Sequence, residues 1–131
     1  MQGFMQDKIL LVDDDDMVLE CFRRLLGRHF DIETAGPEDA LDAMSSRGPY
    51  AVVVSDLLMP GLNGVQFLEK AKKLSPAVVG IVLSGSMEAA DPRLSNNSAI
   101  YKVLDKPCPY PLLMAAVREA IVIHHQRLGT A

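Results

Sequence analysis

The chain has 131 residues, of which 49% are hydrophobic and 23% charged, and its formal net charge is −4. This length suits one domain with a core of its own, and the composition is that of a soluble globular protein. The net negative charge argues against a nucleic-acid surface or an anionic-membrane surface on this chain.

No targeting or membrane segment is visible in the sequence. The first seven residues lack the cationic start and long apolar core of a signal peptide, and apolar runs such as residues 50–54 are far too short to cross a bilayer. Cys21 and Cys108 have no metal-ligand spacing and could not form a disulfide framework. We therefore expect a cytoplasmic protein with reduced thiols.

The first predicted strand ends in a cluster of acids. Residues 8–12 run from a lysine through four aliphatic residues into four consecutive aspartates, Asp13 to Asp16. A continuous aliphatic run is typical of a strand buried on both faces of a parallel sheet. Two unit charges about 4 Å apart interact by about 4 kcal/mol at an effective dielectric constant near 20, so the cluster indicates a bound cation. Capping of the next helix accounts for Asp15 or Asp16 and not for all four.

A helix, an edge strand and a second helix follow. Apolar residues at helical spacing predict the first helix (Val18, Phe22, Leu25 and Leu26), and we expect Cys21 beside them to be a packing residue. Apolar and polar residues alternate over residues 30–35, as in an exposed edge strand. Residues 36–39 open the second helix and residues 45–49 end it, and its apolar face is formed by Ala40, Leu41 and Met44.

The second half of the chain repeats the strand-then-helix order. Buried runs are predicted at 50–56, 78–83 and 100–105, a loop at 57–64 and a helix at 65–74. Residues 87–98 are weakly specified, so any helix there should be short or irregular. A final helix follows Pro109 and Pro111, with one face made of Leu113, Val117, Ala120, Ile121 and His124. Five strand–helix units predict a parallel sheet with helices on both faces.

The ends of these strands collect polar residues at one edge of the sheet, where α/β proteins build their sites: Asp13, Asp14, Asp56, Ser84 and Lys106. Carboxylates hold Mg²⁺, which readily accepts phosphate oxygens, and a carboxylate facing the metal can attack phosphorus. The metal and an ammonium group neutralise the transferred charge, and a hydroxyl can donate to a phosphoryl oxygen. The set therefore predicts phosphoryl transfer.

These motifs resemble the CheY-like receiver domains of two-component response regulators, over residues 8–127. The resemblance is carried by four segments, Val12-Asp13-Asp14, residues 55–64 with the pattern Asp-x-x-Met-Pro-Gly-x-x-Gly, Leu83-Ser84-Gly85 and Lys106-Pro107. Residues 100–107 look most like receivers attached to HD-GYP-type output domains. On this resemblance residues 1–7 form an N-terminal extension, residues 8–127 the receiver domain and residues 128–131 a C-terminal tail.

The resemblance implies a flavodoxin-like (βα)5 fold with strand order 2-1-3-4-5 and a site at the carboxyl ends of the strands. It implies that Asp56 accepts a phosphoryl group from a sensor histidine kinase or phosphotransfer protein. Mg²⁺ would be bound by Asp13, Asp14, Asp56 and the backbone carbonyl of Leu58. Ser84 and Lys106 would hold the phosphoryl oxygens, and the Lys106–Pro107 peptide would be cis.

The same resemblance implies a signalling module and not an enzyme acting on other molecules. The chain would catalyse only its own phosphorylation and dephosphorylation and would act on a downstream output domain or protein. Dimerisation through the fourth helix, fifth strand and fifth helix is common among relatives, and the sequence leaves it open. No nucleic-acid or membrane partner is expected.

The sequence departs from the family pattern at several positions. Val103 stands where relatives have an aromatic switch residue, and Tyr101, two residues earlier on the same strand face, either replaces it or is ordinary edge packing, which we favour. Cys108 stands where a large aromatic residue is usual and is interpreted as a packing substitution. Leu58 cannot orient an attacking water, so slow autodephosphorylation is expected. His124 and His125 are adjacent on a helix and are expected to point apart, with ordinary exposure favoured over metal binding.

Two other functions fit part of the pattern. A haloacid-dehalogenase-type phosphatase would also use a first-strand aspartate, a serine and a lysine, but it needs an acidic pair after the lysine, and Lys106 is followed by Pro-Cys-Pro-Tyr-Pro. A phosphorylation-independent interaction module on the same fold is kept open by Val103. The intact set of five site residues argues against it.

Overall fold

The computed structural model describes residues 7–85, 94 and 96–129. Its central sheet has five parallel strands in the order β2-β1-β3-β6-β7. These strands are β1 (Lys8–Val12), β2 (Asp31–Ala35), β3 (Val52–Asp56), β6 (Val79–Ser84) and β7 (Lys102–Asp105). Counted along the chain, the order is 2-1-3-4-5, so the predicted flavodoxin-like topology is confirmed.

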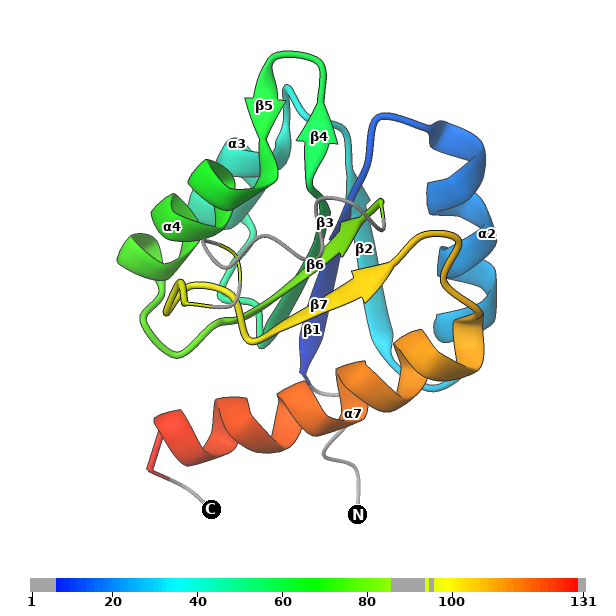
Figure 1. Cartoon of the computed structure of the whole chain (residues 1–131). Helices are drawn as coiled ribbons and strands as arrows, with labels where there is room; N and C mark the ends of the chain where they lie inside the picture. Colours follow the sequence, from blue (N-terminus) through cyan, green and yellow to red (C-terminus); the bar gives the residue numbers. More distant parts are fainter. Residues whose placement is uncertain (1–6, 86–93, 95, 130–131) are drawn as a thin grey trace.

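Helices cover both faces of the sheet. Figure 1 shows α3 (Ala40–Ser46) and α4 (Gly64–Leu74) on one side, and α2 (Asp16–Leu26) and α7 (Tyr110–Arg127) on the other. Each side has its own apolar cluster, because residues of one strand point alternately to the two faces. The strands β1, β3 and β6 are therefore buried almost throughout, as continuous aliphatic runs predict.

The loop predicted at 57–64 contains a small hairpin. Its strands are β4 (Leu58–Met59) and β5 (Leu62–Asn63), which pair antiparallel, and Gly61 takes a φ of 74° at the turn. Asn63 then caps α4, because its side-chain oxygen accepts from the N–H groups of Val65 and Gln66. The hairpin projects beyond the carboxyl end of β3 (Figure 1), next to the edge where the site was predicted.

Several helix details differ from the expectations. The α3 helix begins at Ala40, three residues beyond the expected proline start, because residues 37–39 form a turn instead. On α2 the buried residues are Leu19 and Leu26. Cys21 is exposed, so its assignment as a packing residue is wrong. The core-facing stripe lies about half a turn from this thiol, and the sequence pattern alone did not distinguish the two sides.

The end of α7 is attached to the body of the domain by its histidines. His124 is buried and its Nδ1 lies 2.8 Å from the carbonyl oxygen of Ala77, while His125 contacts the carboxylate of Asp7 at 2.9 Å. The two ring centroids lie 5.4 Å apart in an edge-on arrangement, so the rings do not point apart. His124 is 8% exposed. The expectation of ordinary exposure is therefore wrong for His124.

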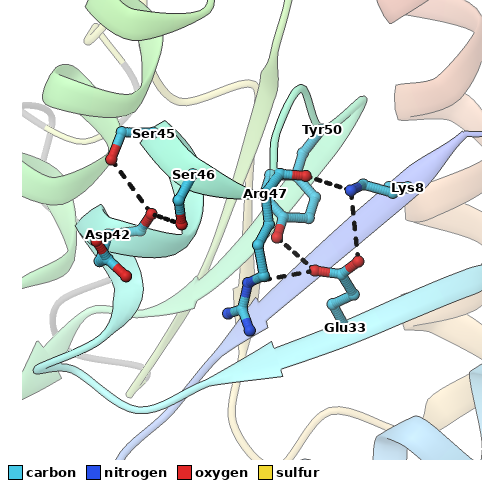
Figure 2. A network of polar contacts seen from close by, with 7 residues as sticks. All are labelled: Lys8, Glu33, Asp42, Ser45, Ser46, Arg47 and Tyr50. Atoms are coloured by element: carbon cyan, nitrogen blue, oxygen red, sulfur yellow. Dashed lines mark hydrogen bonds and ion pairs between the residues drawn. The ribbon is translucent and has the colours of Figure 1, made fainter.

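A polar network lies near the amino ends of β1 and β3, away from the predicted site (Figure 2). Tyr50 is fully buried and its hydroxyl donates to Glu33 at 2.5 Å. Lys8 also pairs with Glu33, donates to the carbonyl of Arg47 and lies over the Tyr50 ring. These contacts join β1, β2, the end of α3 and the start of β3.

Other expectations concern single features. The Lys106–Pro107 peptide is cis, as the resemblance implies, and Gly48–Pro49 is cis as well. In the part of the chain that the structure describes, no helix has the length and apolar character needed to span a membrane. The expectation of a short or irregular helix at residues 87–98 falls mostly outside the described residues.

Candidate functional site

Three carboxylates meet at the carboxyl edge of the sheet. Asp13 and Asp14 follow β1, and Asp56 is the last residue of β3, the neighbouring strand. Each offers a carboxylate oxygen, and these oxygens lie within 4.8 Å of one another. Among the described residues, they form the one group of three or more acidic, histidine or cysteine side chains close enough to share a metal ion.

The four aspartates of the opening cluster divide by position. Asp13 is buried and its Oδ1 accepts from the N–H of Asp15, whereas Asp14 is exposed. Asp15 caps α2 by accepting from Met17 and Val18, and Asp16 lies in the first turn of that helix. The structure therefore separates two carboxylates that face Asp56 from two that begin a helix.

Lys106 completes the polar edge. Its Nζ donates to Oδ1 of Asp56 at 2.7 Å, and the carboxylate is buried whereas the ammonium is about half exposed. Burial lowers the pKa of Lys106, but the hydrogen bond to Asp56 and the charges of the three aspartates outweigh it and hold this pKa above its usual range. The lysine is therefore charged and neutralises part of the carboxylate cluster.

The cluster disfavours its own full ionisation. Burial, with the charge of Asp56 and a hydrogen bond with Asp14, raises the pKa of Asp13 to about 6, against the opposing effects of the Asp15 N–H and Lys106. A cation placed among the oxygens of such incompletely ionised carboxylates would stabilise their charged form. This is an observation of the protein alone that favours a divalent metal.

Ser84 ends β6 beside the other site residues. It is buried, pairs in register with Asp105, and its carbonyl accepts from the N–H of Lys106 at 2.8 Å. Its hydroxyl donates to the carbonyl of Gly85 at 2.9 Å. The backbone thus places Ser84 and Lys106 side by side, and the hydroxyl can rotate toward a group bound at the carboxylates.

Val103 and Tyr101, two of the positions discussed for their departure from the family pattern, pack on opposite faces of the sheet. Val103 packs with the cluster on the α3–α4 side, whereas Tyr101 packs on the α7 side and its hydroxyl donates to Glu119 at 3.2 Å. The premise that the two share a face is wrong, because Tyr101 precedes β7. Tyr101 is edge packing, as favoured, and it does not lie where it could replace an aromatic residue at Val103.

Cys108 and Leu58 also have defined surroundings. Cys108 is half-buried against the cluster on the α7 side, which agrees with a packing substitution, and burial raises the pKa of its thiol. Leu58 is 63% exposed on the hairpin, two residues after Asp56. Its apolar side chain offers no hydrogen bond to an attacking water.

One polar residue near the site had no role in the sequence reasoning. Ser55 is fully buried in β3 and its hydroxyl donates to the carbonyl of Asp56 at 2.9 Å. The visible signal was a serine at the end of a run of three valines that is otherwise aliphatic. Only the folded chain shows where that hydroxyl points.

Residues 9–118 match the family model described as the response regulator receiver domain. Over 121 residues the chain is 36% identical to the hydrogenase transcriptional regulatory protein HoxA of Cupriavidus necator, a match that covers 89% of this chain and 25% of HoxA. The chain therefore spans about a quarter of the length of that relative.

Solved structures agree with this likeness. A crystal structure described as an adenylate cyclase from Rhodopirellula baltica is 29% identical, with a TM-score of 0.89 and coverage of 94% of this chain and 93% of that chain. The signal receiver domain of an HD domain-containing protein from Pseudomonas fluorescens Pf-5 is 25% identical, with a TM-score of 0.79 and coverage of 92% and 98%. The finer resemblance to receivers with HD-GYP-type outputs stays a prediction.

Proposed function

The chain belongs to the family of response regulator receiver domains, and on that premise we propose that Asp56 is its phosphoacceptor. The observation that carries the proposal is the position of this carboxylate, within 4.8 Å of two others and 2.7 Å from the Lys106 ammonium. The phosphoryl group would come from a phosphohistidine on a sensor histidine kinase or a phosphotransfer protein. Residues 8–127 would be the unit that accepts it.

The donor set fits Mg²⁺. Asp13, Asp14 and Asp56 supply hard oxygen ligands, and the backbone carbonyl of Leu58 is the proposed fourth protein ligand. The pKa of Asp13, raised chiefly by burial and further by the charge of Asp56, supports a cation at this place, because a cation would stabilise the ionised carboxylate. When bound, Mg²⁺ supplies positive charge to the phosphoryl oxygens and holds them in place for transfer.

The roles of the side chains follow from their positions. A carboxylate oxygen of Asp56 attacks phosphorus, the phosphorus–nitrogen bond of the donor histidine breaks, and an aspartyl phosphate forms on Asp56. Lys106 already lies on Asp56, so its ammonium can move to an oxygen of the transferred group and balance the added negative charge. The hydroxyl of Ser84, now bound to Gly85, would turn to donate to another phosphoryl oxygen.

We extend the proposal to the role of the chain in the cell. It would catalyse only its own phosphorylation and dephosphorylation, in the cytoplasm, where ATP-dependent kinases supply its donors. HoxA, which it matches over a quarter of that protein's length, is a transcriptional regulatory protein by name. By analogy the phosphorylated chain would act on an output domain or a downstream protein, with dimerisation left open.

A second function, an interaction module that works without phosphorylation, is favoured by one observation. Val103 is an aliphatic residue packed against the core on the α3–α4 side and cannot swing as an aromatic ring does. The usual aromatic switch is therefore not available at this position. The complete carboxylate, lysine and serine set favours the phosphoacceptor over this alternative.

The proposal is tested by the intact mass of the protein after incubation with acetyl phosphate and Mg²⁺. We expect a gain of one phosphoryl group that is lost in Asp56→Asn and kept in Asp16→Asn, a matched change at an exposed aspartate that is not among the three grouped carboxylates. No gain together with normal Mg²⁺ binding would favour the interaction module. Steady release of phosphate from small esters would favour the phosphatase.

A further inference from the structure

Buried polar side chains are few in the described part of the chain, and one of them has no role yet. Apart from Tyr50, whose hydroxyl donates to Glu33, the set comprises Asp13, Ser55, Asp56, Ser84 and His124. Three of these belong to the carboxyl edge, and His124 joins α7 to the loop before β6. Ser55 remains, in the middle of the sheet and next to the proposed phosphoacceptor.

The strand does not need a hydroxyl at this position for packing. Ser55 lies in register between Val12 of β1 and Val82 of β6, so both neighbours are aliphatic. Burying a hydroxyl among such neighbours is unfavourable unless it makes a hydrogen bond. Its partner is the carbonyl of Asp56, at 2.9 Å, which is the acceptor of the peptide that joins Asp56 to Leu57.

Gly64, the first residue of α4, also lies against this peptide. A Cβ added to Gly64 would lie 2.2 Å from the Asp56 carbonyl oxygen and 3.0 Å from Cα of Leu57, so the helix start lies directly against this peptide. The N–H of Gly64 donates to the carbonyl of Leu57 at 2.8 Å, and the N–H of Leu57 donates to Leu83 of β6 at 2.9 Å. The turn out of β3 is therefore held by β6, by α4 and by the Ser55 hydroxyl.

We propose that Ser55 is a positioning residue for phosphoryl transfer. Its hydroxyl holds the Asp56–Leu57 peptide so that the Asp56 carboxylate and the Leu58 carbonyl keep their spacing around the metal. Ser55 touches neither donor nor metal and acts through the backbone on either side of Asp56. The expected effect of Ser55 on the phosphorylation rate rests on the function proposed for Asp56. Its effect on the position of the Asp56–Leu57 peptide rests only on the contacts described above.

The test compares Ser55→Ala with Val53→Ala. Val53 is also fully buried, belongs to the apolar cluster on the α3–α4 side and carries no hydrogen-bonding group, so its truncation reports the cost of altering the core alone. In Ser55→Ala we expect roughly three- to tenfold weaker Mg²⁺ binding and a similar fall in the maximal rate of phosphorylation by acetyl phosphate, with KM unchanged. Val53→Ala should leave all three values as in wild type.

Two further readouts separate positioning from stability. Hydrogen exchange in the Mg²⁺-free protein should speed up at the amides of Leu57 and Gly64 in Ser55→Ala and not in Val53→Ala. Ser55→Thr, which keeps a hydroxyl, should restore Mg²⁺ affinity and rate. Wild-type values in Ser55→Ala, equal losses in Val53→Ala, or a threonine variant no better than alanine would overturn the assignment.

Failure of the phosphoacceptor function can be told apart from failure of this inference. If the wild-type chain takes no phosphoryl group, the function proposed for Asp56 is wrong. In that event the exchange rates and the Mg²⁺ affinities still decide the part played by Ser55. Faster exchange and weaker Mg²⁺ binding limited to Ser55→Ala would support it, and unchanged values would refute it.

Discussion

The ammonium of Lys106 lies 2.7 Å from Oδ1 of Asp56, a residue fifty positions earlier in the chain. The two belong to β3 and to the turn after β7, with β6 between these strands in the sheet. The pair joins a buried carboxylate to a half-exposed cation, so the charge of the carboxylate is already partly neutralised before any metal or phosphoryl group arrives.

Removal of that cation should separate metal binding from phosphoryl transfer. In Lys106→Met we expect tighter Mg²⁺ binding, because a competing positive charge is gone, and phosphorylation by acetyl phosphate slowed by roughly tenfold or more, because charge on the transferred group is no longer balanced. Mg²⁺ titration calorimetry and intact mass measure the two effects. Lys102→Met, which removes a lysine paired with Glu119, is the matched control and should change neither. Weaker Mg²⁺ binding in Lys106→Met would contradict the arrangement.

Acid should weaken Mg²⁺ binding through Asp13. Its pKa is raised from 3.8 to about 6 in the folded protein, chiefly by burial, so below pH 6 a proton competes with the metal and affinity should fall by up to about tenfold per pH unit.

The same shift in the pKa of Asp13 means that the metal-free protein loses stability from this group as pH rises from about 4 to about 6. Urea unfolding without Mg²⁺ at both ends of this range checks the sign. The loss should be absent in Asp13→Asn, and an unchanged loss in that variant would refute the assignment.

Tyr50 should ionise at a higher pH than an ordinary tyrosine phenol. Burial, with the hydrogen bond and charge of Glu33, raises the pKa of its phenol to about 12. The stability that this phenol contributes is present below pH 10 and is lost as pH rises toward 12. Absorbance titration at alkaline pH should show one of the three tyrosines ionising about two pH units late, and Tyr50→Phe should remove that step. Loss of the late step in Tyr101→Phe instead would show the assignment to be mistaken.

The aspartyl phosphate should be long-lived because Leu58 cannot hold an attacking water. This side chain is exposed on the hairpin and carries no hydrogen-bonding group. Leu58→Asn should shorten the half-life of phosphorylated protein severalfold, whereas Leu62→Asn, on the facing strand of the hairpin, should not. The decay is followed by intact mass after removal of acetyl phosphate. A wild-type half-life of seconds would count against the idea.

Gly64→Ala should disturb the site from the helix side. The added methyl would lie 2.2 Å from the Asp56 carbonyl oxygen. Because the atoms that it meets are backbone atoms of Asp56 and Leu57, which cannot easily move away, we expect destabilisation of about 2 kcal/mol or more. Gly61→Ala is the control, since nothing lies within 4 Å of its Cβ and its φ of 74° should cost only about 1 kcal/mol. Denaturant unfolding gives both values. Equal losses would mean that contact with Asp56 does not matter.

Periodicity alone was enough for most of the framework. The aliphatic runs before Asp13, Asp56 and Ser84 place the three central strands within two residues of their positions in the structure, because such runs favour strands buried on both faces. The resemblance supplied the strand order and the cis peptide before Pro107. Short hairpin strands after Asp56 were missed, since two residues carry no period.

Side-chain direction was the weaker part of the sequence reasoning. Cys21 was placed toward the core and is exposed, and Tyr101 was placed on the face of Val103 and packs on the other. Both errors have the same source. Residue spacing predicts which side chains share a face of a helix or strand. It does not say at which residue the element begins or ends, or which of two neighbouring helix faces packs against the sheet.

The amino-acid order alone was sufficient to show that acids end two buried strands and that a serine and a lysine end two others, because side-chain chemistry and strand period are local properties. Distances within the site are not local. That Asp13 and Asp14 reach Asp56, that Lys106 lies on it, and that the Ser55 hydroxyl points to its carbonyl all depend on parallel pairing across strands far apart in the chain. Burial in that sheet also raises the pKa of Asp13, and this burial depends on elements from distant parts of the chain.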